Sequence, residues 1–112
     1  MNSRPVDLVH LSRYTLGERA LEREVLQLFC SQSPIYIERL HAARSEKDWK
    51  DAAHSLKGSA TAIGAWRTAS AAASAEALPP EASSEAREAR LREVESSVRE
   101  AEIYIGVLLE DR

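Results

Sequence analysis

Apolar residues recur along this chain at the spacing that places them on one face of an α-helix. The clearest example lies between Ser45 and Gly64, where apolar side chains follow one another at three- and four-residue steps. These side chains are Trp49, Ala53, Leu56, Ala60 and Ile63. Ser45 is the expected N-cap of this helix, and Gly64 is its expected C-terminal stop.

A short helix is predicted near the N-terminus. Residues 1–6 are expected to form a flexible lead. Asp7 is the expected N-cap of a helix that ends near Arg13, with Leu8 and Leu11 as its apolar contacts.

A long helix is predicted over about residues 17–44, with Thr15 as its cap and Glu18 as the capping-box partner. Pro34 lies in its middle, and an internal proline removes a backbone donor and disturbs the helix. The pattern leaves open whether the chain bends there or forms two collinear helices. Two apolar lines are expected to face the core: Leu21, Val25, Leu28 and Ile35 in one, and Phe29, Tyr36 and Leu40 in the other.

Two helices are predicted after the central one. Alanine dominates about residues 66–78, which favours close helix packing, and Pro79-Pro80 ends this stretch. The last helix covers about residues 83–109, and its apolar residues have the spacing of a bundle seam. They are Leu91, Val94, Val98, Ala101, Ile105 and Leu108. Together these elements predict an all-α fold, an antiparallel up-and-down four-helix bundle with a short additional N-terminal helix.

Composition narrows the class of protein further. The 112 residues predict a single domain over residues 1–112, and the net charge of −3 without a basic run argues against nucleic-acid binding. No apolar stretch is long enough to span a membrane. The single cysteine, Cys30, fits a reducing compartment, so we expect a cytoplasmic protein. We also expect a monomer. Three scattered histidines and one cysteine lack the spacing of metal ligands.

A polar strip on the central helix carries the candidate chemistry. His54, Lys57 and Gly58 are spaced i, i+3 and i+4, so they share a face that the apolar stripe does not occupy. Lys50 and Thr61 extend this strip. A glycine inside a helix costs about 1 kcal/mol relative to alanine, which suggests that Gly58 keeps space clear beside the imidazole.

The run HSLKGSATAIGA, residues 54–65, resembles the phosphoacceptor helix of histidine-containing phosphotransfer (HPt) domains. In that family HxLKG is followed by small residues and a glycine. The close match covers about a quarter of the chain, residues 49–76. The resemblance implies that His54 accepts a phosphoryl group, that Lys57 balances its charge and that Gly58 gives clearance.

Glu76 is the candidate that orients the imidazole. If the chain turns at residues 64–65, His54 and Glu76 lie at about equal distances from the turn and level with each other. A carboxylate there accepts the proton of Nδ1 and leaves Nε2 as the nucleophile. HPt domains often carry glutamine or glutamate at the corresponding place. The alternative is that Glu76 is a surface charge.

The resemblance also implies the partners, which are response-regulator receiver domains or a hybrid histidine kinase in a multistep phosphorelay. The divalent metal that transfer requires is expected in the partner receiver, so no cofactor is expected in this chain. Because no ATP-binding motif is recognisable, we expect a phosphocarrier and not an enzyme. The expected docking residues are Lys50, Thr61, Leu11 and Tyr14.

Two other interpretations remain open at this stage. The chain is a helical-bundle module that binds a receiver or kinase without being phosphorylated, or it is the phosphoacceptor domain of a larger chemotaxis-type kinase. The start at Met1 and the charged end favour a complete small protein.

Overall fold

The structure, a computed structural model, describes residues 4–110. Within this range the chain forms five α-helices and no strands, which confirms the predicted all-helical class. The helices are α1 (Leu8–Thr15), α2 (Arg19–Ala42), α3 (Glu46–Ile63), α4 (Trp66–Glu76) and α5 (Ser84–Glu110).

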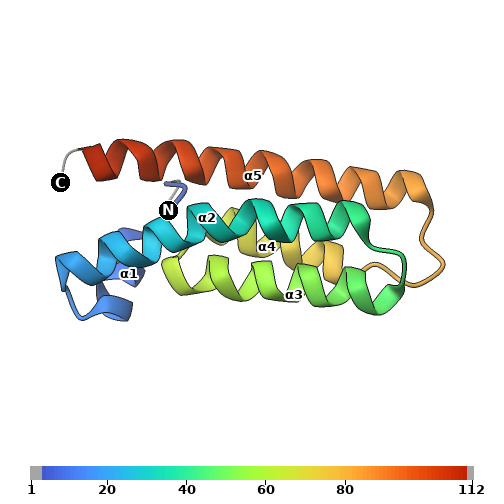
Figure 1. Cartoon of the computed structure of the whole chain (residues 1–112), viewed down its shortest axis with the longest axis horizontal. Coiled ribbons are helices and arrows are strands. Elements are labelled where there is room, and N and C mark those ends of the chain that lie inside the picture. Colours follow the sequence, from blue (N-terminus) through green and yellow to red (C-terminus); the bar gives the residue numbers. More distant parts are fainter. Residues whose placement is uncertain (1–3, 111–112) are drawn as a thin grey trace.

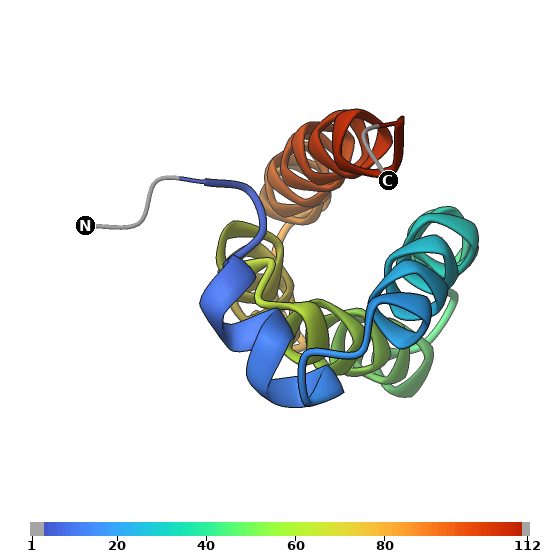
Figure 2. The ribbon, with the colours of Figure 1, turned by 90° about the vertical axis from the view of Figure 1, so that its left-hand side faces the viewer.

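The four longer helices lie side by side along the 45 Å axis of the molecule (Figure 1). α3 packs against α2 and α4, and α5 packs against α2 and α4. Seen along the long axis, these helices surround a shared interior, and α1 lies across one end, against α2 and α3 (Figure 2). The most extensive packing joins α3 to α4, the two helices that carry the candidate site.

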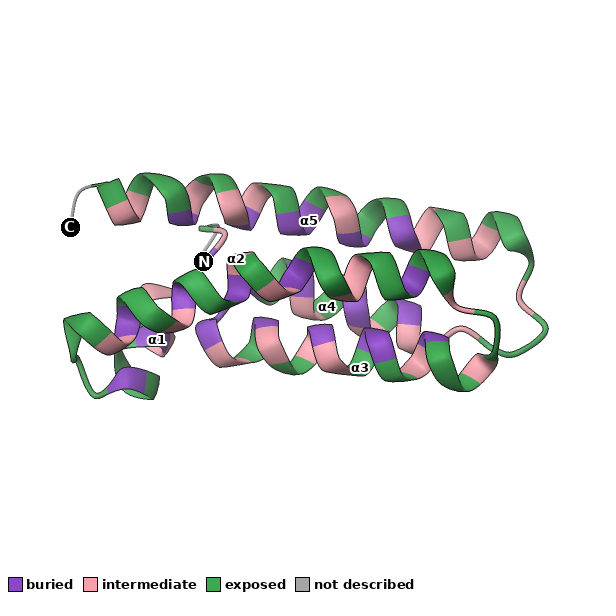
Figure 3. Cartoon of the chain, in the orientation of Figure 1, coloured by how far each residue is buried: buried purple, intermediate pink, exposed green. Residues whose placement is uncertain are grey.

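Buried residues line the inward faces of the helices (Figure 3). All five apolar positions predicted on α3 are buried, and so are the predicted seam residues of α5 except Leu108. On α4, Ala72 and Ala75 are fully buried. The absence of larger side chains there allows the backbone of α4 to approach its neighbours closely.

The predicted ends of α3 are confirmed. The Ser45 hydroxyl accepts a hydrogen bond from the Asp48 backbone N–H at 3.1 Å, and Glu46 begins the helix. Gly64 ends it in the left-handed conformation, with φ of 77°. The backbone N–H of Asp7 donates to the Gly64 carbonyl at 2.9 Å, so the start of α1 lies directly on this turn.

More of the N-terminal segment packs into the core than the sequence predicted. Asp7 is the N-cap of α1 and accepts from the backbone N–H of His10, as predicted. Val6 is completely buried in the core, so the expected flexible lead does not extend to it. Residues 1–3 of that lead lie outside the described residues.

The predicted capping box of α2 is wrong. Thr15 is the last residue of α1, is buried, and donates its hydroxyl proton toward the Leu11 carbonyl and the Glu22 carboxylate. Leu16 and Gly17 follow Thr15 and form the turn after α1, and both adopt positive φ. Glu18 takes the N-cap position of α2 without a side-chain hydrogen bond.

α2 is one continuous helix with Pro34 inside it. The inward line predicted through Leu28 and Ile35 is wrong, because these side chains are 50% and 49% exposed. The second predicted line fits better, since Phe29 and Leu40 are buried. The core-facing side of α2 is thus rotated away from Leu28 and Ile35.

Candidate functional site

His54 projects from the third turn of α3 toward solvent. Its side chain is 69% exposed, whereas Ala53 on the same turn is completely buried. The imidazole therefore lies outside the core, as the separation of the polar strip from the apolar stripe predicted.

Glu76 lies beside His54. Its Oε2 is 3.0 Å from His54 Nδ1, which confirms the predicted proximity of the two side chains. Because a carboxylate only accepts hydrogen bonds, Nδ1 is the donor in this contact, and in the neutral ring the lone pair is then on Nε2.

Trp49 fixes the end of α4 at the site. Its indole N–H donates to the Ala75 carbonyl at 2.7 Å, in a buried hydrogen bond between α3 and α4. Ala75 directly precedes Glu76, so the bond holds the backbone that carries this carboxylate against α3. The sequence predicted Trp49 only as a packing residue, and the spacing of the apolar residues does not indicate this second role.

Lys57 contacts the same carboxylate. Its Nζ lies 2.8 Å from Glu76 Oε1, so Glu76 holds one side chain with each oxygen. The sequence predicted Lys57 as a partner of the phosphoryl group, and it did not predict this ion pair. The sequence placed Lys57 and Glu76 each beside His54, but helical spacing alone does not show that the two side chains pair with each other.

The shared contacts keep Glu76 ionised. The Lys57 ammonium lowers the pKa of the Glu76 carboxyl below its ordinary value of 4.5, and the hydrogen bond with His54 acts in the same direction. Partial burial opposes both effects. The carboxylate form, which can accept the proton of Nδ1, is therefore the form present at neutral pH.

Gly58 is exposed, and nothing lies within 4 Å of the position that a Cβ would occupy. The fold itself therefore does not require glycine there. Gly64 is different, because its φ is positive and a Cβ would lie 2.8 Å from Asp7 Cβ. The open space at Gly58 lies one helical turn from His54.

The four expected docking residues differ from one another in exposure and in contacts. Lys50 pairs with Glu46 at 3.3 Å, and the exposed Thr61 donates its hydroxyl proton to the Lys57 carbonyl. Tyr14 is 54% exposed. Leu11 is only 1% exposed because α1 packs this side chain into the core, so the expectation that it contributes to a docking surface is wrong.

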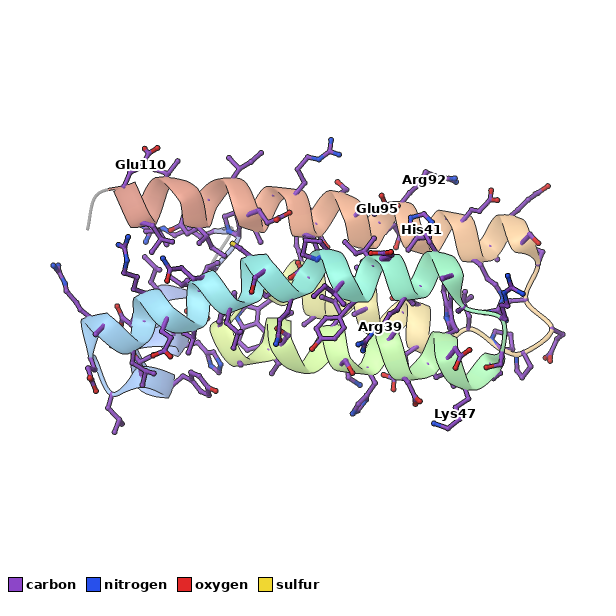
Figure 4. The ribbon with its side chains drawn as sticks, viewed as in Figure 1. Arg39, His41, Lys47, Arg92, Glu95 and Glu110 are labelled. Carbon is purple, nitrogen blue, oxygen red and sulfur yellow. The ribbon has the colours of Figure 1, made fainter. Side chains whose placement is uncertain are left out.

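The other two histidines lie in different surroundings from His54. His41 on α2 lies beside Glu95 on α5, 3.3 Å away through Nε2 (Figure 4). The ring of His10 meets the edge of Trp66. Over residues 4–110, no group of three or more His, Cys, Asp or Glu side chains is arranged to hold a metal ion.

One of three comparisons with known proteins gave a match. The family model of the Hpt domain matches residues 24–104, a range that includes His54, Lys57, Gly58 and Glu76. Neither the curated proteins nor the solved structures gave a match. No helix in the described part of the chain is long and apolar enough to cross a membrane. Because the family model covers most of the sequence, this chain belongs to the Hpt domain family.

Proposed function

We propose that this chain carries a phosphoryl group on His54 between receiver domains of a multistep phosphorelay. Hpt domains are phosphocarrier modules that interact with receiver domains and kinases. The observation that carries the assignment to His54 is its exposed imidazole, with Nδ1 on the Glu76 carboxylate and Nε2 free of that contact.

In the proposed reaction, the Nε2 lone pair attacks the phosphorus of an aspartyl phosphate. The N–P bond forms while the P–O bond to the aspartyl group breaks, and the released carboxylate keeps the electron pair. Nδ1 retains its proton, so the ring becomes positively charged. The negative charge of Glu76, 3.0 Å away, stabilises this form of the ring.

Lys57 and Gly58 have supporting roles in this proposal. The Lys57 ammonium balances the charge of the phosphoryl group once it is on His54. Gly58 leaves room for the phosphoryl group and for the partner, which is supported by the open space around its Cα. We place the divalent metal of the reaction in the partner receiver.

The docking surface is proposed to extend from His54 across the groove between α3 and α2. Asp51 and Ser55, next to His54 on α3, line this groove together with Arg39 of α2. The exposed Ile35 lies one turn before Arg39, and Leu28 lies two turns further along the same face. These apolar side chains, with Tyr14, Lys50 and Thr61, suit a receiver domain that must reach the imidazole.

We infer that the four longer helices form the antiparallel up-and-down bundle expected from the sequence. Short connections between successive helices and the cyclic packing of α2, α3, α4 and α5 support this topology. The arrangement places His54 on the outside of one helix pair, where a monomer can present it to successive partners.

The test is a transfer assay with a receiver domain that carries a labelled aspartyl phosphate. We expect label to appear on this chain, to be labile in acid and stable in base, and to disappear in His54→Gln. His41→Gln is a matched control, because His41 is also an exposed helical histidine beside a glutamate, and this variant should keep the label. Binding without any label on the wild-type chain would reject the carrier role.

A further inference from the structure

Glu76 holds two side chains of α3 at once. Its Oε2 contacts His54 Nδ1 at 3.0 Å, and its Oε1 contacts Lys57 Nζ at 2.8 Å. In the part of the chain that the structure describes, Lys57 forms no other ion pair. The ammonium assigned to the phosphoryl group is thus bound to a carboxylate before any phosphoryl group arrives.

The Lys57–Glu76 pair is suited to exchange. The side chains are 37% and 26% exposed, and ion pairs in contact with solvent are weak. Lysine also carries its charge on a flexible four-carbon stem. A protein-bound phosphoryl group brings about 1.5 to 2 negative charges and three acceptor oxygens. The phosphoryl group is therefore a stronger partner for the Lys57 ammonium than the Glu76 carboxylate, which also binds the His54 imidazole.

We propose, on the basis of the phosphoacceptor role of His54, that Glu76 is a positioning residue for Lys57 as well as for His54. In the unphosphorylated chain Glu76 binds the Lys57 ammonium, and on phosphorylation the ammonium moves to the phosphoryl oxygens. No covalent bond changes in this exchange, and the ammonium keeps its three protons. The whole charge of Glu76 then acts on the N–H of Nδ1, at the moment when the ring has become positive.

The exchange can be followed directly at the lysine side chains by NMR. The chain has only three lysines, Lys47, Lys50 and Lys57, so its side-chain ammonium spectrum is simple. Before phosphorylation, Glu76→Gln is expected to shift the ¹⁵N resonance of Lys57 and to leave that of Lys47, which is paired with Asp51, in place. Phosphorylation by phosphoramidate, with His54→Gln as the control, should shift Lys57 again.

Two results of this experiment would overturn the exchange. One is a Lys57 resonance that does not respond to phosphorylation of His54. The other is a response of Lys50 in its place, because Lys50 lies one turn before His54 on the same strip. Failure of both phosphoramidate and a phosphorylated receiver to modify His54, read by mass, would reject the phosphoacceptor role itself. That outcome is therefore distinguishable from a failed exchange.

A double-mutant cycle tests the same proposal through the phosphoryl equilibrium with a receiver. Lys57→Met removes the phosphoryl contact, but in the wild-type background it also removes the pair with Glu76 from the unphosphorylated state. In the Glu76→Gln background only the phosphoryl contact is lost. Lys57→Met should therefore reduce the phosphorylated fraction less in the wild-type background, by a factor of roughly two to five. Equal reductions in the two backgrounds would overturn the proposal.

Discussion

At the scale of single residues, the site consists of two nitrogens that share one carboxylate. His54 and Lys57 are three residues apart on α3, and Glu76 reaches both of them from the end of α4. The positions of His54 and Glu76 followed from helical spacing and from the predicted turn at residues 64–65. The ion pair of Lys57 did not, because spacing on one helix cannot tell which neighbouring acid a flexible side chain selects.

Lys57→Ala should slow phosphoryl transfer while leaving the fold intact. The variant loses a charge-assisted contact to the phosphoryl group, a kind of interaction worth about 1.5–3 kcal/mol, so we expect a rate reduction of about tenfold or more. Initial rates of transfer from a phosphorylated receiver measure the effect, and thermal unfolding followed by circular dichroism checks the fold. An unchanged rate would remove Lys57 from the mechanism.

Gly58→Leu should block partner access or phosphorylation of His54. Leucine favours helix over glycine, and the fold has room for a side chain at this position. Lost transfer in a stable variant would therefore result from obstruction of the partner. Gly106→Leu is the matched control, because a Cβ at Gly106 also meets nothing within 4 Å. Normal transfer by Gly58→Leu would show that the clearance argument is wrong.

The Lys57–Glu76 pair should make stability depend on pH in a defined direction. Because the pKa of Glu76 in the folded chain is below 4.5, the pair stabilises fully above that pH and is lost as the pH falls through the lowered value. His54→Gln and the double variant His54→Gln/Glu76→Gln isolate this pair. Their unfolding free energies should differ by about 0.5 kcal/mol near neutral pH, and the difference should shrink below about pH 4.5. A difference that grows on acidification would contradict the assignment.

At the scale of elements, the ends of helices were predictable only where the chain has strong local signals. Ser45 and Gly64 delimit α3 as expected because a side-chain cap and a left-handed glycine are local features. Thr15 misled the prediction because its hydroxyl has a competing partner in α1 and a buried neighbour, Glu22, in α2. Which partner the Thr15 hydroxyl binds depends on tertiary packing, and a local capping pattern carries no information about tertiary packing.

Gly64→Ala should destabilise the chain strongly, although the substitution adds only one carbon atom. A left-handed conformation costs a residue with a Cβ about 1–2 kcal/mol, and the added carbon would lie 2.8 Å from Asp7 Cβ. We expect the free energy of unfolding to fall by about 2 kcal/mol or more. Gly106→Ala, in the exposed interior of α5, should instead raise it by up to about 1 kcal/mol. Chemical denaturation of both variants measures the contrast, and equal effects would contradict it.

At the scale of the whole molecule, the all-helical class was predictable, but the continuity of α2 through Pro34 and its rotation were not. Its two apolar lines are adjacent, and either one satisfies the helical repeat. Packing against both α3 and α5 selects the line of Phe29 and Leu40 and leaves Leu28 and Ile35 exposed. For Leu11, the predicted apolar contact of α1 is confirmed and the docking role is wrong, because the side chain that packs α1 into the core cannot also reach a partner.

The exposed face of α2 yields a prediction about partner binding. Ile35→Ser should weaken binding to a receiver with little change in stability, because Ile35 is half exposed. Loss of one apolar contact in an interface costs about 1 kcal/mol or more, which corresponds to roughly fivefold in Kd. Ile103→Ser, on the exposed face of α5, is the matched control and should bind normally. Equal affinities of both variants would place the docking surface elsewhere.

The two tryptophans provide an optical readout of this architecture. Trp49 is buried and bonded to Ala75 beside Glu76, whereas Trp66 is 42% exposed and donates its indole proton to Asp7 at 2.9 Å. We expect the buried indole of Trp49 to emit at a shorter wavelength than the exposed indole of Trp66. Undocking of α1 should alter only the emission of Trp66. Separation of α4 from α3 should alter the emission of Trp49. The native chain therefore reports the integrity of each end of the α3–α4 pair without an added dye.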